Sequence, residues 1–106
     1  MSTVSFLTSE ELATFKDEVR EGRCVLLDVR EEREYETGHI PLALSKPLSK
    51  VEAWINDLDK DMESITYCRS GKRSHRAAEI LVSRGFQTVH TLEGGLNSWK
   101  KPLSQE

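Results

Sequence analysis

The stretch that decides the fold is Ile65-Thr66-Tyr67-Cys68-Arg69-Ser70-Gly71-Lys72-Arg73-Ser74. Three residues that favour β-strands precede the cysteine, and a short polar and basic loop follows it. Apolar residues at helical spacing come after this loop, at Ala77, Ala78, Ile80 and Leu81. The pattern predicts a buried strand, a tight loop and a helix that begins near Ser74 and ends at Gly85. The strand therefore brings Cys68 to the point where the chain turns from sheet to helix.

Strands and helices alternate on both sides of this stretch. Apolar runs predict further strands at Cys24–Val29 and Gln87–Thr91, and Val4–Leu7 is a shorter candidate. Helical spacing marks residues 8–22, 31–35, 48–58 and 96–99. The first of these helices opens with a capping box formed by Thr8 and Glu11. Inner strands that are apolar throughout are typical of parallel sheets, so we expect an α/β three-layer sandwich, with a mostly parallel central sheet of about five strands and helices on both faces.

The length and composition predict one domain. The 106 residues fit a single domain over residues 1–106, with a core at about 4–100 and a loose tail at 101–106. Hydrophobic residues make up 37% of the chain, enough for one core, and no apolar run approaches the roughly 18 residues of a membrane span. The N-terminus lacks the pattern of a signal peptide. We therefore expect a cytoplasmic protein with no membrane partner.

Charge and cysteine content narrow the function further. A net charge of −3 argues against a nucleic-acid partner. Four cations, and no acidic residue, lie between Cys68 and Ala78, which suggests attraction for a small anion. Neither Cys24 nor Cys68 belongs to a CxxC pair, and the three histidines lack metal-ligand spacing. The sequence predicts free thiols, with no metal and no cofactor.

Cys68 is the candidate nucleophile. If the loop curls around it, backbone N–H groups point inward, and the following helix adds the positive end of its dipole. Such surroundings favour the thiolate, and Gly71 supplies the backbone freedom that a tight loop needs. The alternative is that Cys68 is an ordinary buried thiol beside a solvated helix face. The polar residues after it favour a thiol open to solvent, whereas Cys24 begins an apolar strand and is expected to be structural.

The chain resembles the rhodanese family, in particular its single-domain members of the thiosulfate sulfurtransferase type. The likeness runs from about Phe6 to Trp99, and it rests on motifs that are weak singly but specific in this order. They are Leu27-Asp28-Val29-Arg30, Glu34-Tyr35, Gly38-His39-Ile40-Pro41, the Cys68–Arg73 loop followed by Ser74, Gly85-Phe86, and Leu92-Glu93-Gly94-Gly95 with Trp99. The family usually has glycine after the proline, where this chain has Leu42, so the local turn and pocket rim are expected to differ.

The resemblance implies a rhodanese-like fold and a role for each residue of the loop. Cys68 would carry sulfur as a persulfide, and the residues that bind the donor would be Arg69, Ser70, Gly71, Lys72 and Arg73. The donor would be thiosulfate or a related small anion, and the acceptor would be cyanide or a thiol such as thioredoxin or glutathione. Asp28, Arg30, Glu34 and His39 match positions that are mainly structural in the family, and we expect an Asp28–arginine network that braces the sheet edge.

Three other functions compete with this interpretation. A cysteine-dependent phosphatase would resemble C-x5-R, whereas the spacing here is C-x4-R, and no aspartate near the loop offers itself as a general acid. A non-catalytic binding module of the same fold tends to lack the cysteine that this chain keeps. A redox-sensing thiol is the third alternative, because exposed cysteines of low pKa also oxidise. The loop favours sulfur transfer over all three.

Overall fold

A computed structural model describes residues 3–105 of the chain. Its centre is a five-stranded sheet in the order β1-β5-β4-β2-β3, and every pairing between these strands is parallel. The strands are β1 Val4–Leu7, β2 Cys24–Asp28, β3 Leu44–Ser45, β4 Glu63–Tyr67 and β5 Val89–Leu92. The predicted parallel sheet is confirmed, although β5 begins at Val89, two residues later than expected.

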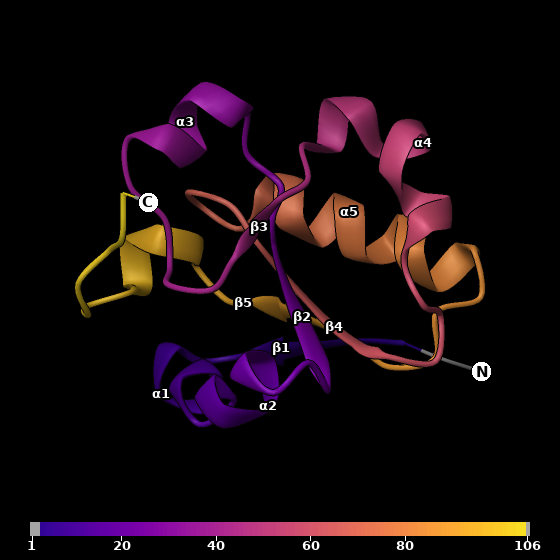
Figure 1. Cartoon of the computed structure of the whole chain (residues 1–106), viewed down its shortest axis with the longest axis horizontal. Helices are drawn as coiled ribbons and strands as arrows, with labels where there is room; N and C mark the ends of the chain where they lie inside the picture. Colours follow the sequence, from indigo (N-terminus) through magenta and orange to yellow (C-terminus); the bar gives the residue numbers. More distant parts are fainter. Residues whose placement is uncertain (1–2, 106) are drawn as a thin grey trace.

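Helices cover both faces of the sheet (Figure 1). The α-helices are α1 Ser9–Ala13, α2 Lys16–Arg20, α3 Glu32–Glu36, α4 Val51–Trp54 and α5 Lys72–Ser83. Three 3₁₀ turns accompany them, η1 Leu48–Lys50, η2 Ile55–Asp57 and η3 Gly95–Ser98. One apolar core lies between the sheet and α4 with α5, and a second lies between the sheet and α1 with α2. The three-layer α/β sandwich is therefore confirmed.

Two segments predicted as single helices are broken into shorter pieces. The predicted helix over residues 8–22 is wrong as one element, because Thr14 ends the first turn: its N–H and its hydroxyl both donate to the Glu11 carbonyl, at 3.1 and 2.6 Å. The capping box of Thr8 and Glu11 is present as predicted. Residues 48–57 form η1, α4 and η2 in succession rather than one helix. At the two ends of this segment, backbone N–H groups donate to carbonyls three residues earlier, from Lys50 to Pro47 and from Leu58 to Ile55.

Leu42 stands where the resemblance leads one to expect glycine, and its backbone keeps the glycine conformation. Its φ of 76° lies in the left-handed region, and it is the only residue other than glycine with a positive φ in the described part of the chain. This conformation costs an L-residue about 1–2 kcal/mol. The Leu42 side chain is 47% exposed. The departure in sequence thus places an exposed apolar side chain at a turn whose backbone conformation favours glycine.

The C-terminal segment forms hydrogen bonds with the residues that follow α3, while position 106 of the expected tail lies outside the described residues. Ser104 forms an isolated antiparallel bridge with His39, through N–H to carbonyl bonds of 2.8 and 2.7 Å. The Gln105 side chain also donates to the Thr37 carbonyl at 3.1 Å. These backbone groups follow α3 and lie outside the sheet, so the tail satisfies polar groups that the sheet leaves unpaired. Within residues 3–105, no helix has the length and apolar character needed to span a bilayer.

Candidate active site

Cys68 comes directly after β4, at the carboxyl end of an inner strand, and its side chain lies in the core beneath α5. Three groups of the following loop surround its sulfur atom. The Gly71 N–H donates to Sγ at 3.1 Å and the Ser74 N–H donates to it at 3.3 Å. The Ser74 hydroxyl oxygen lies 3.4 Å from Sγ. The loop therefore forms the inward-facing set of amide groups that the sequence predicts.

These contacts change the acidity of the thiol. Burial by itself would raise the pKa of Cys68, since it disfavours the charged form. Hydrogen bonds from the Ser74 hydroxyl and from the N–H groups of Ser74, Gly71 and Ser70 outweigh burial and lower the pKa of Cys68 below its ordinary value. Cys68 is thus more readily ionised than a free thiol, as a nucleophilic cysteine needs to be.

The expectation that Cys68 opens to solvent is wrong. The residue is only 1% exposed. The polar residues after it do not splay outward, because the loop folds back so that its amides can reach the sulfur. Arg69 and Ser70 carry the exposed surface of the loop, and the sulfur lies below them.

Helix α5 begins two residues before the predicted position near Ser74. Gly71 is its N-cap residue, with a φ of 102° in the left-handed region, and Lys72 is its first residue. Ser74 therefore lies in the first turn of a 12-residue helix, where its N–H has no partner within the helix and is free to bind the sulfur. The sequence predicts this helix but not the contact between Ser74 and Cys68. The pattern that could have indicated it is a serine in the first helical turn after the cysteine.

Arg73, which the resemblance assigns to donor binding, forms an ion pair with Glu34 of α3. Two nitrogens of its guanidinium contact the two carboxylate oxygens at 2.7 and 3.1 Å. The hydrogen bond from Arg73 lowers the pKa of Glu34 to about 2. Glu34 also accepts the Glu31 N–H at 3.0 Å and so caps its own helix. The Arg73 charge is therefore largely offset, and the ion pair ties the loop to α3.

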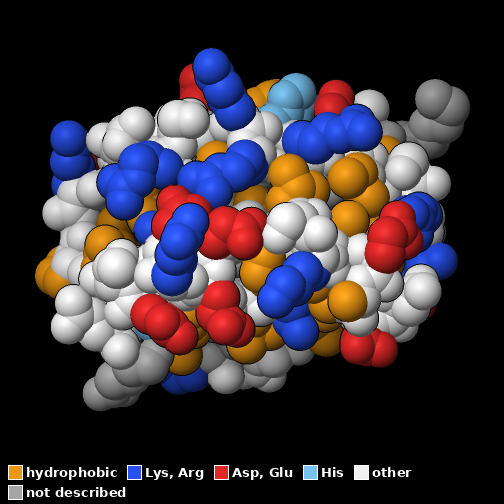
Figure 2. All heavy atoms as spheres, turned by 90° about the horizontal axis from the view of Figure 1, so that it is seen from above, with side chains coloured by type: hydrophobic (Ala, Val, Ile, Leu, Met, Phe, Trp, Pro, Cys, Tyr) orange, Lys and Arg blue, Asp and Glu red, His pale blue; other side chains and the backbone are white. Residues whose placement is uncertain are grey.

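The other cations of the loop are free of such partners. Arg69 and Lys72 are exposed, and neither forms an ion pair with a described residue. Ser70 is exposed as well, and its N–H is among the groups that favour the thiolate. Figure 2 shows the face above α3, α4 and α5, where lysine and arginine side chains lie among carboxylates. This face therefore carries charges of both signs.

The turn that follows β5 forms backbone hydrogen bonds with the Cys68 loop. The Leu96 N–H donates to the Cys68 carbonyl at 2.9 Å, and the Asn97 N–H donates to the Arg69 carbonyl at 3.0 Å. Gly95 makes this approach possible, because a Cβ there would lie 2.4 Å from the Cys68 carbonyl oxygen. The sequence identified Gly94 and Gly95 as turn and packing residues. The structure adds that the backbone they pack against is that of the Cys68 loop.

The predicted Asp28–arginine network is confirmed. Arg30 and Asp28 form a buried ion pair at 2.7 Å, and Arg30 also donates to the Gly38 carbonyl at 2.7 Å. The Tyr67 hydroxyl donates to the Asp28 carboxylate at 2.8 Å and accepts the Ile40 N–H at 3.0 Å. Each of these residues thus has a partner for its buried polar groups in the network, as the low-polarity interior favours. The network holds the end of β4, and hence Cys68, against β2.

Comparison with known proteins agrees with this geometry. The family described as "Rhodanese-like domain" matches residues 11–102. The chain belongs to the rhodanese-like family. Its coverage of that domain takes in both the Cys68 loop and the Gly95 turn that supports it. All the loop residues predicted from the sequence therefore lie within the part of the chain that the family defines.

Individual relatives differ in how they are named. The chain is 33% identical over 88 residues to "Thiosulfate sulfurtransferase GlpE" of Pseudomonas syringae pv. syringae, which covers 83% of each protein. It is 38% identical over 89 residues to "Putative sulfur carrier protein YrkF" of Bacillus subtilis, covering 83% of this chain but 48% of that relative, so the chain spans about half of its length. A rhodanese-related protein from Thermoplasma volcanium has the same fold, with a TM-score of 0.83, 27% identity, and coverage of 96% of this chain and 99% of the other.

Proposed function

We propose that this protein is a sulfurtransferase in which Cys68 takes a sulfane sulfur from thiosulfate, or from a related small anionic donor, and passes it to a thiol or to cyanide. The observation that carries the proposal is the set of hydrogen-bond donors around Cys68 Sγ. These donors stabilise negative charge on sulfur, and both the attacking thiolate and the persulfide carry such a charge. The relative named thiosulfate sulfurtransferase supports the same chemistry.

The reaction divides into two displacements at sulfur. The Cys68 thiolate attacks the outer sulfur of thiosulfate, a new S–S bond forms, and sulfite leaves with the electron pair of the broken bond. Cyanide or an acceptor thiolate, such as that of thioredoxin or glutathione, then attacks the terminal sulfur of the persulfide. Cys68 leaves as a thiolate and the starting state returns. The lowered pKa of Cys68 favours the thiolate that makes this attack.

The loop residues divide into two roles. Arg69 and Lys72 are exposed and unpaired among the described residues, so they attract the anionic donor, and the Ser70 hydroxyl is placed to donate to it. Gly71 contributes its N–H to the sulfur rather than to the donor. Arg73 is paired with Glu34, which suits a residue that holds the loop in shape. The proposal therefore assigns donor binding to Arg69, Ser70 and Lys72, and loop geometry to Gly71 and Arg73.

Burial of Cys68 sets a condition on the donor. Because the residue is 1% exposed, an attacking or departing group reaches Sγ only when the exposed side of the loop moves outward. A small anion can reach Sγ after a small movement of the loop, whereas a bulky ester would require a large one. Burial thus favours compact sulfur donors.

The experiment is intact mass spectrometry of the protein after incubation with thiosulfate, followed by kinetics. We expect the mass of one sulfur atom on Cys68, its removal by cyanide or dithiothreitol, and catalytic formation of thiocyanate with ping-pong kinetics. Hydrolysis of p-nitrophenyl phosphate should be negligible in the same preparation. A folded protein that gains no sulfur at Cys68 from thiosulfate, polysulfide or glutathione persulfide would contradict the proposal.

A further inference from the structure

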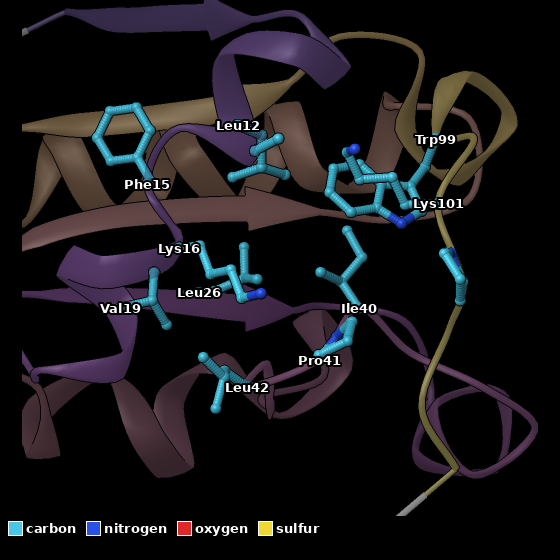
Figure 3. Close-up of a pocket in the computed structure, with 12 residues that line it drawn as sticks. Leu12, Phe15, Lys16, Val19, Leu26, Ile40, Pro41, Leu42, Trp99 and Lys101 are labelled. Atoms are coloured by element: carbon cyan, nitrogen blue, oxygen red, sulfur yellow. The ribbon is translucent and has the colours of Figure 1, made fainter.

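A groove of about 390 Å³ lies on the α1–α2 side of the sheet, away from the Cys68 loop beneath α5 (Figure 3). Its walls come from four parts of the chain: α1 with α2, the middle of β2, the turn at residues 40–42, and the segment at residues 99–102. The accessible apolar side chains of its lining include Phe15, Val19 and Leu42, whereas Leu12, Leu26 and Ile40 are buried. A cavity of this size is within the usual range for small-molecule sites.

One wall of the groove is Trp99, whose indole N–H has no acceptor. The Nε1 atom is buried and without a hydrogen-bond partner among the described residues. Trp54 offers the matched comparison, since its Nε1–H donates to the Pro47 carbonyl at 2.9 Å. A buried donor left without an acceptor is energetically unfavourable. Figure 3 shows the Trp99 nitrogen on the side of the ring that faces Ile40, so a rotation of the ring would bring its N–H to an acceptor bound in the groove.

Two lysines give the groove a positive charge. Lys16 of α2 and Lys101 of the C-terminal segment both line it, and no acidic side chain does. Neither lysine is ion-paired with any residue in the described range. Figure 3 shows the two side chains entering the view from different elements with their nitrogens over the apolar surface. The groove therefore combines apolar walls, an unused donor and two unpaired cations.

We propose that this groove binds an amphipathic carboxylate, a small molecule with an apolar body and one anionic head, of the kind represented by a medium-chain fatty acid. The apolar body would lie on Phe15, Val19 and Leu42, and burial of its surface would drive binding. A carboxylate oxygen would accept the Trp99 N–H, and the negative charge would lie between Lys16 and Lys101. This site is separate from the sulfur-transfer function proposed for Cys68 and does not depend on it.

Leu42 supports the same site from the backbone side. It lines the groove with its side chain 47% exposed, and its φ of 76° is costly for any residue but glycine. A glycine would adopt this turn without strain and would remove that part of the wall. A leucine that is both strained and exposed is explained if the side chain gains contacts with a bound apolar group.

The experiment follows the two indole N–H resonances of the folded protein by ¹H–¹⁵N NMR during titration with octanoate. We expect a saturable shift of the Trp99 resonance, because its N–H gains an acceptor, while the Trp54 resonance stays in place as an internal control. Octanol and octylammonium carry the same chain with a neutral or a positive head. We expect octanol to bind more weakly and octylammonium to cause no saturable shift.

Variants test each part of the site. Lys16→Met and Lys101→Met should each weaken octanoate binding about fivefold, in line with a partly exposed ion pair. Lys50→Met removes an exposed lysine of η1, outside the groove, and should leave binding unchanged. Trp99→Phe keeps the ring and removes the donor, so binding followed at the Ile40 amide should weaken about tenfold. The Trp54 resonance reports whether each variant is folded.

Three outcomes would overturn the proposal. Equal binding of octanoate, octanol and octylammonium would show an apolar surface without selectivity for a carboxylate. A Trp99 resonance that moves with protein concentration, and not with octanoate, would assign the groove to a second copy of the chain. If octanoate caused no saturable shift of the Trp99 resonance in the folded protein, the groove would not be a site for amphipathic carboxylates. Sulfur transfer by Cys68 is measured separately, so its success or failure bears on none of these results.

Discussion

The two cysteines of this chain occupy opposite ends of neighbouring parallel strands. Cys24 is the first residue of β2, and Cys68 follows the last residue of β4, its partner in the sheet. Each is 1% exposed. Burial therefore does not distinguish them, and any difference in reactivity must come from the groups around each sulfur.

Those groups act in opposite directions. Burial, with smaller contributions from the carboxylates of Glu63 and Glu18, raises the pKa of Cys24 to about 12. At Cys68 burial acts in the same sense, but the hydrogen bonds from Ser74, Gly71 and Ser70 outweigh it and lower the pKa. Position in the sheet explains the contrast, since the loops at the carboxyl ends of parallel strands lead into helix N-termini, which carry unpaired N–H groups.

The largest expected effect comes from exchanging the two thiols for alanine. Cys68→Ala should abolish sulfur transfer, because it removes the nucleophile, while Cys24→Ala should leave turnover nearly unchanged. Thiocyanate production, with circular dichroism as the check on folding, measures both. Sulfur transfer at the wild-type rate by folded Cys68→Ala would end the assignment of Cys68.

The second effect concerns stability at alkaline pH. Unfolded Cys24 ionises near pH 8.5, whereas folded Cys24 keeps its proton up to about pH 12, so the wild type loses stability as the pH rises between these values. Cys24→Ala should remove about 2 kcal/mol of this loss at pH 10, measured by urea unfolding at pH 7 and pH 10.

Cys68→Ala is the matched control, with the opposite sign. The folded pKa of Cys68 is lowered, so this thiol adds stability as the pH rises from its folded to its unfolded pKa. The Cys68→Ala protein should therefore lack that gain. If both alanine variants changed the pH profile in the same direction, the contrast between the two thiols would be refuted.

The third effect isolates one hydrogen bond. Ser74→Ala removes the hydroxyl beside Sγ and keeps the backbone N–H, so the pKa of Cys68 should rise and sulfur transfer near pH 7 should fall about tenfold. The rate of iodoacetamide alkylation against pH measures the pKa. Ser70→Ala is the control: only its backbone N–H acts on the thiol, so the pKa should not move, although KM for thiosulfate should rise.

The smallest effect comes from the exposed cations. Arg69→Ala and Lys72→Ala should each raise KM for thiosulfate by a factor that corresponds to about 1 kcal/mol, because solvent and salt screen exposed charges. Added salt should weaken donor binding more in the wild type than in either variant. Unchanged KM and unchanged salt dependence in both variants would show that the loop charge is only a solvated surface.

Local sequence patterns determined the elements that place Cys68 and Cys24. The apolar run before Cys68, the polar loop and the helical spacing after it predicted a strand, a turn and a helix, and the parallel sheet followed from their alternation. The ends of helices were harder to predict. The break at Thr14 and the start of α5 at Lys72 depend on single hydrogen bonds and on caps, which periodicity does not report.

Only the tertiary structure decided how the loop is built and what surrounds it. The Arg73–Glu34 ion pair joins residues 39 positions apart, and the Gly95 turn meets the Cys68 backbone from another strand. Burial of Cys68 and the unpaired Trp99 N–H likewise arise where distant segments come together. The physical reason is that spacing along a chain records which face of one element is apolar, whereas the partner of a polar group depends on which other elements pack against that face.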